Sequence, residues 1–435
     1  MTYKSITAAS IAALLLGSGA ATADTWRYAF EEAMDEVQGK FAQKFKEEVE
    51  ANSDHEVQLF PFGTLGESAD IMEQAQSGIL QFVDQSPGFT GALIPEAQVF
   101  FVPYLLPENQ DALFTFFRDS KAIHELFPPL YAEQGLELLT MFPEGEVVMT
   151  TTGPVASPED LNEVKFRVMT NPLLVQSYQA FGATPTPLPW GEVYGALQTG
   201  IIQGQENPAF FVESTKMYEV TDHITRAGHN NFTTAVMANK EFFDGLGDEE
   251  KAVVQDAIAT AFDYILEYQD GLTEESLAKI QEAKPDMTIT TLTEEQRAPF
   301  KATADTVEAE FLKIGGPQAQ AILDQMKADL DAAGSGAGGE ETAAAPAEGE
   351  AAEAPAAEAE VEAPAAEAEA EAPAAEDPTE GEAEAPAAEA PTDAAAEAPT
   401  DAAAEAPADA EAEAPADAEA EAPAEGEAAE APASN

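Results

Sequence analysis

Residues 24–332 alternate between short apolar segments and amphipathic segments, the pattern of an α/β protein. A first strand is predicted at Thr25–Phe30. An apolar residue then recurs at every fourth position from Val37 to Val49, which places these side chains on one face of a helix. The same criteria predict a strand at Glu56–Phe62, a helix at Glu67–Ser77 that ends at Gly78, and a strand at Ile79–Asp84.

The alternation returns further along the chain, where four strands and two helices are predicted. The strands are Leu136–Phe142, Val147–Thr151, Lys165–Met169 and Ile201–Glu206, and the helices are Pro172–Phe181 and Trp190–Thr199. Two such runs predict two lobes with a mostly parallel sheet covered by helices on both faces. The region Asp248–Ala283 reads as helical with a possible break at Gly271, and Gln318–Ala332 is the last predicted helix.

The N-terminus has the features of a secretory signal peptide. Lys4 is followed by the short apolar segment Ile11–Leu16, and Ala21-Thr22-Ala23 provides small residues at the positions that a signal peptidase requires. Cleavage would remove residues 1–23 and leave Asp24 first. No other segment approaches the length of a membrane span, so we expect an exported, periplasmic protein that is not inserted in the membrane.

The composition changes completely after Ala332. The glycine-rich segment Gly334–Gly339 is predicted to be a flexible joint. Ala, Glu, Asp and Pro then dominate in near-exact repeats, and 31 acidic residues but no Lys or Arg lie between Asp331 and Asn435. Such a sequence has too few apolar residues to form a core. Residues 333–435 are therefore predicted to be a disordered acidic tail, with a helical stalk as the alternative.

Charge and composition exclude several functions. A formal net charge of −63 repels nucleic acid, and the absence of Cys excludes disulfides and thiolate chemistry. The four His lack the spacing of a zinc pair, and Gly334-x-Gly336-x-x-Gly339 follows a predicted helix, whereas a dinucleotide-binding loop follows a strand. No nucleophile, base and orienting group come together in the sequence. We therefore expect no catalytic residues, no metal and no cofactor.

Arg167 is the residue that most needs an explanation. It lies inside the apolar strand Lys165–Met169, where a charged side chain costs several kcal/mol unless it finds a partner. No acidic residue stands beside it in the sequence. Its partner is either a distant Asp or Glu in a structural salt bridge, or a ligand carboxylate held by the guanidinium group.

The segments around Arg167 resemble the solute-binding subunits of tripartite ATP-independent periplasmic (TRAP) transporters, over roughly residues 24–330. The resemblance rests on Asn171–Leu174, Phe181–Trp190, Gly191–Gly200 and Gly204–Pro208. It implies a two-lobed periplasmic binding protein fold with a hinge and a long spanning helix, which closes over one ligand. It also implies delivery of that ligand to TRAP membrane subunits.

Within that family the chain is similar to members that bind ectoine or 5-hydroxyectoine, as seen in Trp26–Glu32, Asn52–His55, Gly63–Gln74 and Ser86–Gly91. The resemblance implies that Arg167 and Asn207 hold a carboxylate, that Glu32 faces the positive end, and that aromatic side chains pack on the ring. The aromatic residues are Phe89, Trp190, Phe232 and Phe211, with Phe210 as a competitor for the place of Phe211 and Glu31 and Glu36 as rivals of Glu32.

Three alternatives remain open from the sequence. The same fold could bind another organic acid, such as a dicarboxylate, although an acidic residue facing the ligand would repel a second carboxylate. The chain could be a secreted enzyme, or a surface protein whose function lies in its acidic tail.

Overall fold

The computed structural model describes residues 24–337, so the predicted signal peptide and nearly all of the predicted tail lie outside the described residues. A ten-stranded sheet runs through this region in the order β2-β1-β3-β9-β4-β7-β5-β6, with β8 beside β4 and β10 beside β8. Its strands are β1 Thr25–Ala29, β2 Glu56–Phe60, β3 Phe82–Gln85, β4 Leu136–Thr151, β5 Lys165–Val168, β6 Thr184–Pro187, β7 Gly204–Pro208, β8 His223–Arg226, β9 Asn231–Asn239 and β10 Thr288–Thr291.

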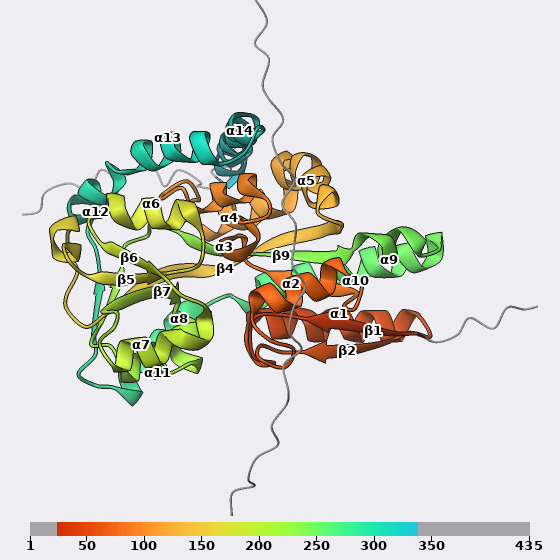
Figure 1. The fold of residues 1–435 in the computed structure, drawn as a ribbon, viewed down its shortest axis with the longest axis horizontal. Coiled ribbons are helices and arrows are strands. Elements are labelled where there is room, and N and C mark those ends of the chain that lie inside the picture. Colours follow the sequence, from red (N-terminus) through yellow and green to blue (C-terminus); the bar gives the residue numbers. More distant parts are fainter. Residues whose placement is uncertain (1–23, 338–435) are drawn as a thin grey trace, which may run out of the picture. The chain divides into compact units, whose positions relative to one another are not determined.

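The first lobe is built on the parallel strands β1, β2 and β3, with β9 antiparallel to β3. Helix α1, Val37–Asn52, buries Val37, Phe41, Phe45 and Val49 completely, as the fourfold spacing predicted. This helix packs against α10, Asp248–Tyr268, on the same side of the molecule as β1 and β2 (Figure 1). Burying one continuous apolar face in this way is what stabilises an amphipathic helix in water.

The second lobe contains β5, which is parallel to β6 and β7, together with β8 and β10. The short helices α7, Val193–Gln198, and α8, Ala209–Ser214, close around a second apolar core that includes Val148, Ile202 and Ile224. The first predicted run of strands and helices, which ends at Asp84, belongs to the first lobe, and the strands of the second run from Val147 onward belong to this second lobe. The predicted two-lobed architecture is confirmed.

Strand β4 belongs to both lobes. Its residues Leu136 to Glu146 pair with β9, and Val147 to Thr151 pair with β7 and β8, all antiparallel. The pairing shifts register between Pro143 and Gly145, and Gly145 has a φ of +123°, which a residue with a side chain rarely adopts. The sequence predicts two separate strands in this segment and gives no signal for β9. Strands β4 and β9 therefore form the connection, or hinge, between the lobes.

The predicted long helix is interrupted at Gly271, which has a φ of +74°. Before it, α10 packs on α1 in the first lobe, and after it, α11, Leu272–Ala283, packs on α8 in the second. The two helices together span both lobes. The last helix, α14, Ala319–Ala337, continues past the predicted end at Ala332 and through Gly334, where a flexible joint was expected.

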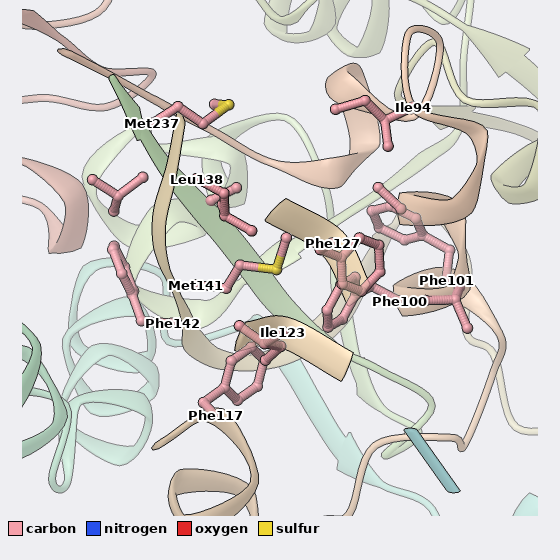
Figure 2. Packing of buried hydrophobic residues seen from close by; sticks show 14 of the residues in the cluster. Ile94, Phe100, Phe101, Phe117, Ile123, Phe127, Leu138, Met141, Phe142 and Met237 are labelled. Carbon is pink, nitrogen blue, oxygen red and sulfur yellow. The ribbon is translucent and has the colours of Figure 1, made fainter. Parts of the chain in front are cut away.

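The largest cluster of buried apolar residues extends from β1 to α14, and one part of it lies where the helices that follow β3 meet the first half of β4. Figure 2 shows Phe100, Phe117, Phe127 and Met141 converging there from four different elements. The remaining helices are α2 Ser68–Gln76, α3 Pro87–Thr90, α4 Gln110–Asp119, α5 Phe127–Glu133, α6 Pro172–Ala180, α9 Lys240–Gly245, α12 Glu294–Lys301 and α13 Ala304–Ile314. This core fixes the position of β4 and hence of the hinge.

Candidate ligand-binding site

A small cavity with a volume of about 30 Å³ lies between the two lobes, so the side chains that line it lie close together. Its walls come from the first lobe, from the second lobe and from hinge strand β9. The lining residues are Glu31, Glu32, Gln38, Phe62, Ser68, Phe89, Arg167, Met169, Trp190, Asn207, Pro208, Phe211 and Phe232. All of the residues predicted for the site are among them.

The second lobe contributes a positive charge to the cavity. Arg167, on β5, is only 2% exposed, and its Nε and Nη2 donate hydrogen bonds to the carbonyl oxygen of Leu188, at 3.1 and 2.9 Å. Among residues 24–337 the arginines that form ion pairs are Arg118, Arg226 and Arg297, and Arg167 forms none. Burial lowers the pKa of Arg167 to about 10, so the guanidinium is charged at neutral pH without a carboxylate partner.

Aromatic rings surround this guanidinium and the adjoining space. Its carbon Cζ lies 5.5 Å from the centre of the Trp190 ring. The centres of the Trp190 and Phe211 rings are 4.6 Å apart. Phe89 and Phe232 line the cavity as well, whereas Phe210, the competitor of Phe211, is buried and is not part of the lining. Aromatic rings that line a cavity can pack on a flat ligand and attract a weakly hydrated cation.

The first lobe contributes carboxyl groups. Glu31 and Glu32 follow β1 in a bend, so both side chains reach the cavity. The backbone N–H of Ser86 donates to Glu31 Oε2 at 2.9 Å, and the backbone N–H of Gln38 donates to Glu32 Oε2 at 2.8 Å. Glu36, the other rival of Glu32, is outside the lining, because it accepts hydrogen bonds from Ala33 N and from the Ser214 hydroxyl.

Burial sets the protonation of these acidic residues. It raises the pKa of Glu31 to about 8, and it raises the pKa of Glu32, whose carboxyl is also close to Glu144 and Glu36. The cavity therefore has a guanidinium at its second-lobe end and a group of acidic residues at its first-lobe end. This arrangement can bind a molecule that carries a carboxylate on one side and a positive charge on the other.

A second concave surface lies between α4 and α10 and is lined by Phe117, Leu139, Phe262 and neighbouring side chains. Its cation, Arg118, is already paired with Asp263 at 2.7 Å and lies at the surface. The cavity between the lobes is therefore the stronger candidate.

Comparison with known proteins identifies the family. Residues 28–314 match the family described as bacterial extracellular solute-binding protein, family 7. The chain belongs to this family.

Two relatives of this solute-binding protein match over nearly their whole length. The ectoine/5-hydroxyectoine-binding periplasmic protein UehA of Ruegeria pomeroyi is 69% identical over 331 residues, which are 76% of this chain and 97% of the relative. The ectoine-binding periplasmic protein TeaA of Halomonas elongata is 59% identical over the same shares. The solved structure of the periplasmic ectoine-binding protein from the TeaABC TRAP transporter of Halomonas elongata covers 71% of this chain and 100% of its own, with a TM-score of 0.70.

These matches place the solute-binding protein in the periplasm, and they fit the two-lobed architecture. No helix within residues 24–337 is both long and apolar enough to cross a membrane. In the same region, no three His, Cys, Asp or Glu residues are grouped so that they could hold a metal ion.

Five lining residues are not predicted from the sequence: Gln38, Phe62, Ser68, Met169 and Pro208. Gln38 lies on the buried face of α1, and its neighbours on that face are apolar. A polar residue on such a face is a signal that could have been recognised. Phe62, Ser68, Met169 and Pro208 carry no comparable signal, because each residue type is common in loops and cores.

His229 lies behind the site and does not line it. Its Nε2 lies 3.2 Å from the Tyr178 hydroxyl and 3.2 Å from Glu206 Oε2, and the Tyr178 hydroxyl donates to the same Glu206 oxygen at 2.6 Å. Glu206 precedes Asn207 on β7. This buried network holds the strand that carries Asn207, which agrees with a structural role for the histidine.

Proposed function

We propose that this protein is the ectoine/5-hydroxyectoine receptor of a TRAP transporter. It captures the ligand between its two lobes by closing about the hinge, and it delivers the ligand, chemically unchanged, to the membrane subunits. The observation that carries the proposal is that the buried Arg167, which has no acidic partner among residues 24–337, lines the same cavity as Glu32. The identity of 69% and 59% to two ectoine-binding proteins supports it.

The chemistry of ectoine suits this arrangement. Ectoine is a compact zwitterion with a carboxylate on a ring whose amidinium charge is delocalised. Arg167 receives the carboxylate through charge-assisted hydrogen bonds, each contributing about 1.5–3 kcal/mol, and Asn207 donates its amide to the same group. Glu32 accepts from the amidinium N–H groups at the opposite end.

The ring would lie among the aromatic residues. Phe89 belongs to the first lobe, Trp190 and Phe211 to the second, and Phe232 to hinge strand β9. A ligand that contacts residues of both lobes binds the closed form better than the open form, so it shifts the population toward closure. The membrane subunits would recognise that closed form.

Titration calorimetry tests the ligand. The protein is titrated with ectoine, 5-hydroxyectoine, glycine betaine and succinate, and the two ectoines are expected to bind most tightly. Succinate carries two carboxylates, and one of them would lie against Glu31 and Glu32, so we expect no binding. Binding of succinate without any heat from ectoine would overturn the ligand assignment in favour of a dicarboxylate.

A second measurement addresses catalysis. Ectoine is incubated with excess protein, the protein is denatured, and the released molecule is analysed by mass spectrometry and proton NMR. A receptor returns ectoine with its ring intact. A hydrolysed or otherwise altered product would identify a secreted enzyme instead.

A further inference from the structure

Gln38 is a buried polar residue whose hydrogen bonds connect the acidic end of the cavity to the hinge. It is the second residue of α1 and is 1% exposed, on a face whose other buried members include Phe41 and Phe45. A side-chain amide in such surroundings costs free energy unless its polar atoms have partners. The partners of this amide therefore indicate why a glutamine is present.

The backbone and the side chain of Gln38 each hold one of the two acidic residues. Its backbone N–H donates to Glu32 Oε2 at 2.8 Å, and its Oε1 accepts from the backbone N–H of Glu31 at 2.8 Å. The N–H groups in the first turn of a helix have no partner within the helix, so the Glu32 carboxyl group satisfies one of them. Glu31 and Glu32 form a bend between β1 and α1 that is neither helix nor strand, here called the acidic bend. Gln38 holds it at two successive residues.

The amide nitrogen of Gln38 donates to both hinge strands. Nε2 donates to Glu144 Oε1 on β4 at 3.0 Å and to Thr234 Oγ1 on β9 at 2.9 Å, and the Thr234 hydroxyl donates to the same Glu144 oxygen. Glu144 is 1% exposed and Thr234 is completely buried, and neither is among the lining residues of the cavity. Glu144 adjoins the register shift at Gly145. Gln38 thus connects the acidic bend to the place where the lobes are joined.

This arrangement uses every hydrogen-bonding group of the Gln38 amide. The oxygen faces an N–H donor, and the two N–H groups face a carboxyl oxygen and a hydroxyl oxygen. Exchanging the amide oxygen and nitrogen would therefore break the hydrogen bonds with Glu31 and Glu144. Gln38 lines the cavity, but the protein itself engages both N–H groups. It has no N–H group to offer to a ligand.

We propose that Gln38 is a positioning residue, which holds the acidic bend against hinge strands β4 and β9 and so places the Glu32 carboxyl group for the positive end of the ligand. The inference rests on the proposed function, because it needs a ligand with a positive end. The acidic bend is ordered when the protein folds, so its conformational entropy is not lost again when the ligand binds. Gln38 raises the affinity in this way without contacting the ligand.

The test is calorimetric titration of full-chain variants with ectoine, at a temperature at which circular dichroism shows each variant to be folded. Gln38→Met has a side chain of similar length without an amide, and it keeps the backbone N–H that donates to Glu32. We expect the dissociation constant for ectoine to rise by about 10-fold to 100-fold, because the acidic bend is no longer held. An unchanged dissociation constant would overturn the inference and leave the proposed function intact. Absence of ectoine binding by the unchanged protein would overturn the proposed function itself.

Val49→Ala is the matched control for stability. Val49 is completely buried near the other end of α1 and does not line the cavity. Its truncation leaves a void and should lower the melting temperature, whereas the folded variant should bind ectoine as tightly as the unchanged protein. If Gln38 served the stability of the fold alone, Gln38→Met would behave in the same way as this control, and the inference would be wrong.

A rescue experiment tests whether the contact with the hinge is the cause. Gln38→Glu places one carboxyl group opposite that of Glu144, so that two acceptors face each other, and it should weaken binding as Gln38→Met does. Adding Glu144→Gln restores a donor and an acceptor with their roles exchanged, keeps an acceptor for the Glu31 N–H, and returns the net charge to that of the unchanged protein. We expect the double variant to recover most of the lost affinity.

Two results of the rescue experiment would contradict the inference. A double variant that binds no better than Gln38→Glu would show that the contact with Glu144 does not matter for binding. Tighter binding by Gln38→Glu alone would mean that the side chain at this position contacts the positive end of the ligand directly.

Thr234→Val decides the question if Gln38→Met does not fold. It removes one acceptor of the Gln38 amide from outside the cavity lining and leaves the contact with Glu144. The loss of one hydrogen bond should raise the dissociation constant for ectoine by about 3-fold to 10-fold. A Thr234→Val variant with the affinity of the unchanged protein would overturn the inference.

Discussion

Replacing Arg167 by methionine separates a ligand-binding role from a structural one. Methionine fills most of the volume of the arginine side chain but cannot donate a hydrogen bond or carry a charge. Within residues 24–337, Arg167 donates only to the Leu188 carbonyl and forms no ion pair. The substitution therefore removes few interactions within the protein itself.

The effect on stability can be estimated from the pKa of Arg167. Its fall to about 10 means that the folded protein disfavours the charged form, which costs about 3 kcal/mol at neutral pH. The methionine variant removes this cost and loses two hydrogen bonds of about 1 kcal/mol each. The two contributions nearly cancel, so the free energy of unfolding of the empty protein should change by no more than about 1–2 kcal/mol.

The effect on binding is much larger. A ligand carboxylate enclosed by the closed lobes would lose its charged partner, which costs about 2–5 kcal/mol, or roughly 30-fold to several thousand-fold in affinity. Calorimetry with ectoine measures the affinity, and thermal unfolding without ligand measures the stability. Arg118→Met, at an exposed ion pair, is the control and should change neither. An Arg167→Met variant that binds ectoine normally, or one that is unfolded at room temperature, would refute the reasoning.

Three further predictions follow from the same geometry. Trp190→Ala removes the ring over Arg167 and should weaken ectoine binding by about 2 kcal/mol, or roughly 30-fold, in a fluorescence or calorimetric titration. Gly39→Ala should lower the free energy of unfolding by about 1–3 kcal/mol in urea despite the better helix propensity of alanine, because its Cβ would lie 2.2 Å from the Ala33 carbonyl oxygen. Deleting the chain after Ala337 should leave the dissociation constant for ectoine unchanged, because every lining residue precedes position 233; a weaker complex would show that the deleted segment contributes to binding.

Local patterns in the sequence predicted the elements whose buried apolar residues lie close together in the sequence. The four buried residues of α1 are an example, and the apolar strand around Arg167 is another. Strand β4 was divided in the prediction because Pro143 cannot donate to a neighbouring strand, which normally ends a strand. The register shift next to Gly145 lets the strand continue past Pro143. Its partner strand is β9, which lies about 90 residues further along the chain.

The sequence predicted those site residues that can be recognised one at a time, by their surroundings or by a motif. Arg167 could be recognised from its charge within an apolar strand, and the aromatic residues from a resemblance to known sequences. The contacts of the buried Glu144 with Gln38 and Thr234 could not be recognised, because they join residues 106 and 90 positions apart. The sequence also could not decide between Glu31 and Glu32, since the choice depends on a bend that turns both side chains into the cavity.

The two ends of the cavity belong to different lobes, and this division links recognition to closure. Arg167 and Asn207 come from β5 and β7 in the second lobe, and Glu31 and Glu32 follow β1 in the first. A molecule with a single negative charge interacts favourably only with the second lobe. It does not attract the acidic residues of the first lobe. A zwitterion with opposite charges at its two ends attracts both lobes at once. The distribution of charge between the lobes therefore makes closure depend on the kind of ligand as well as on its presence.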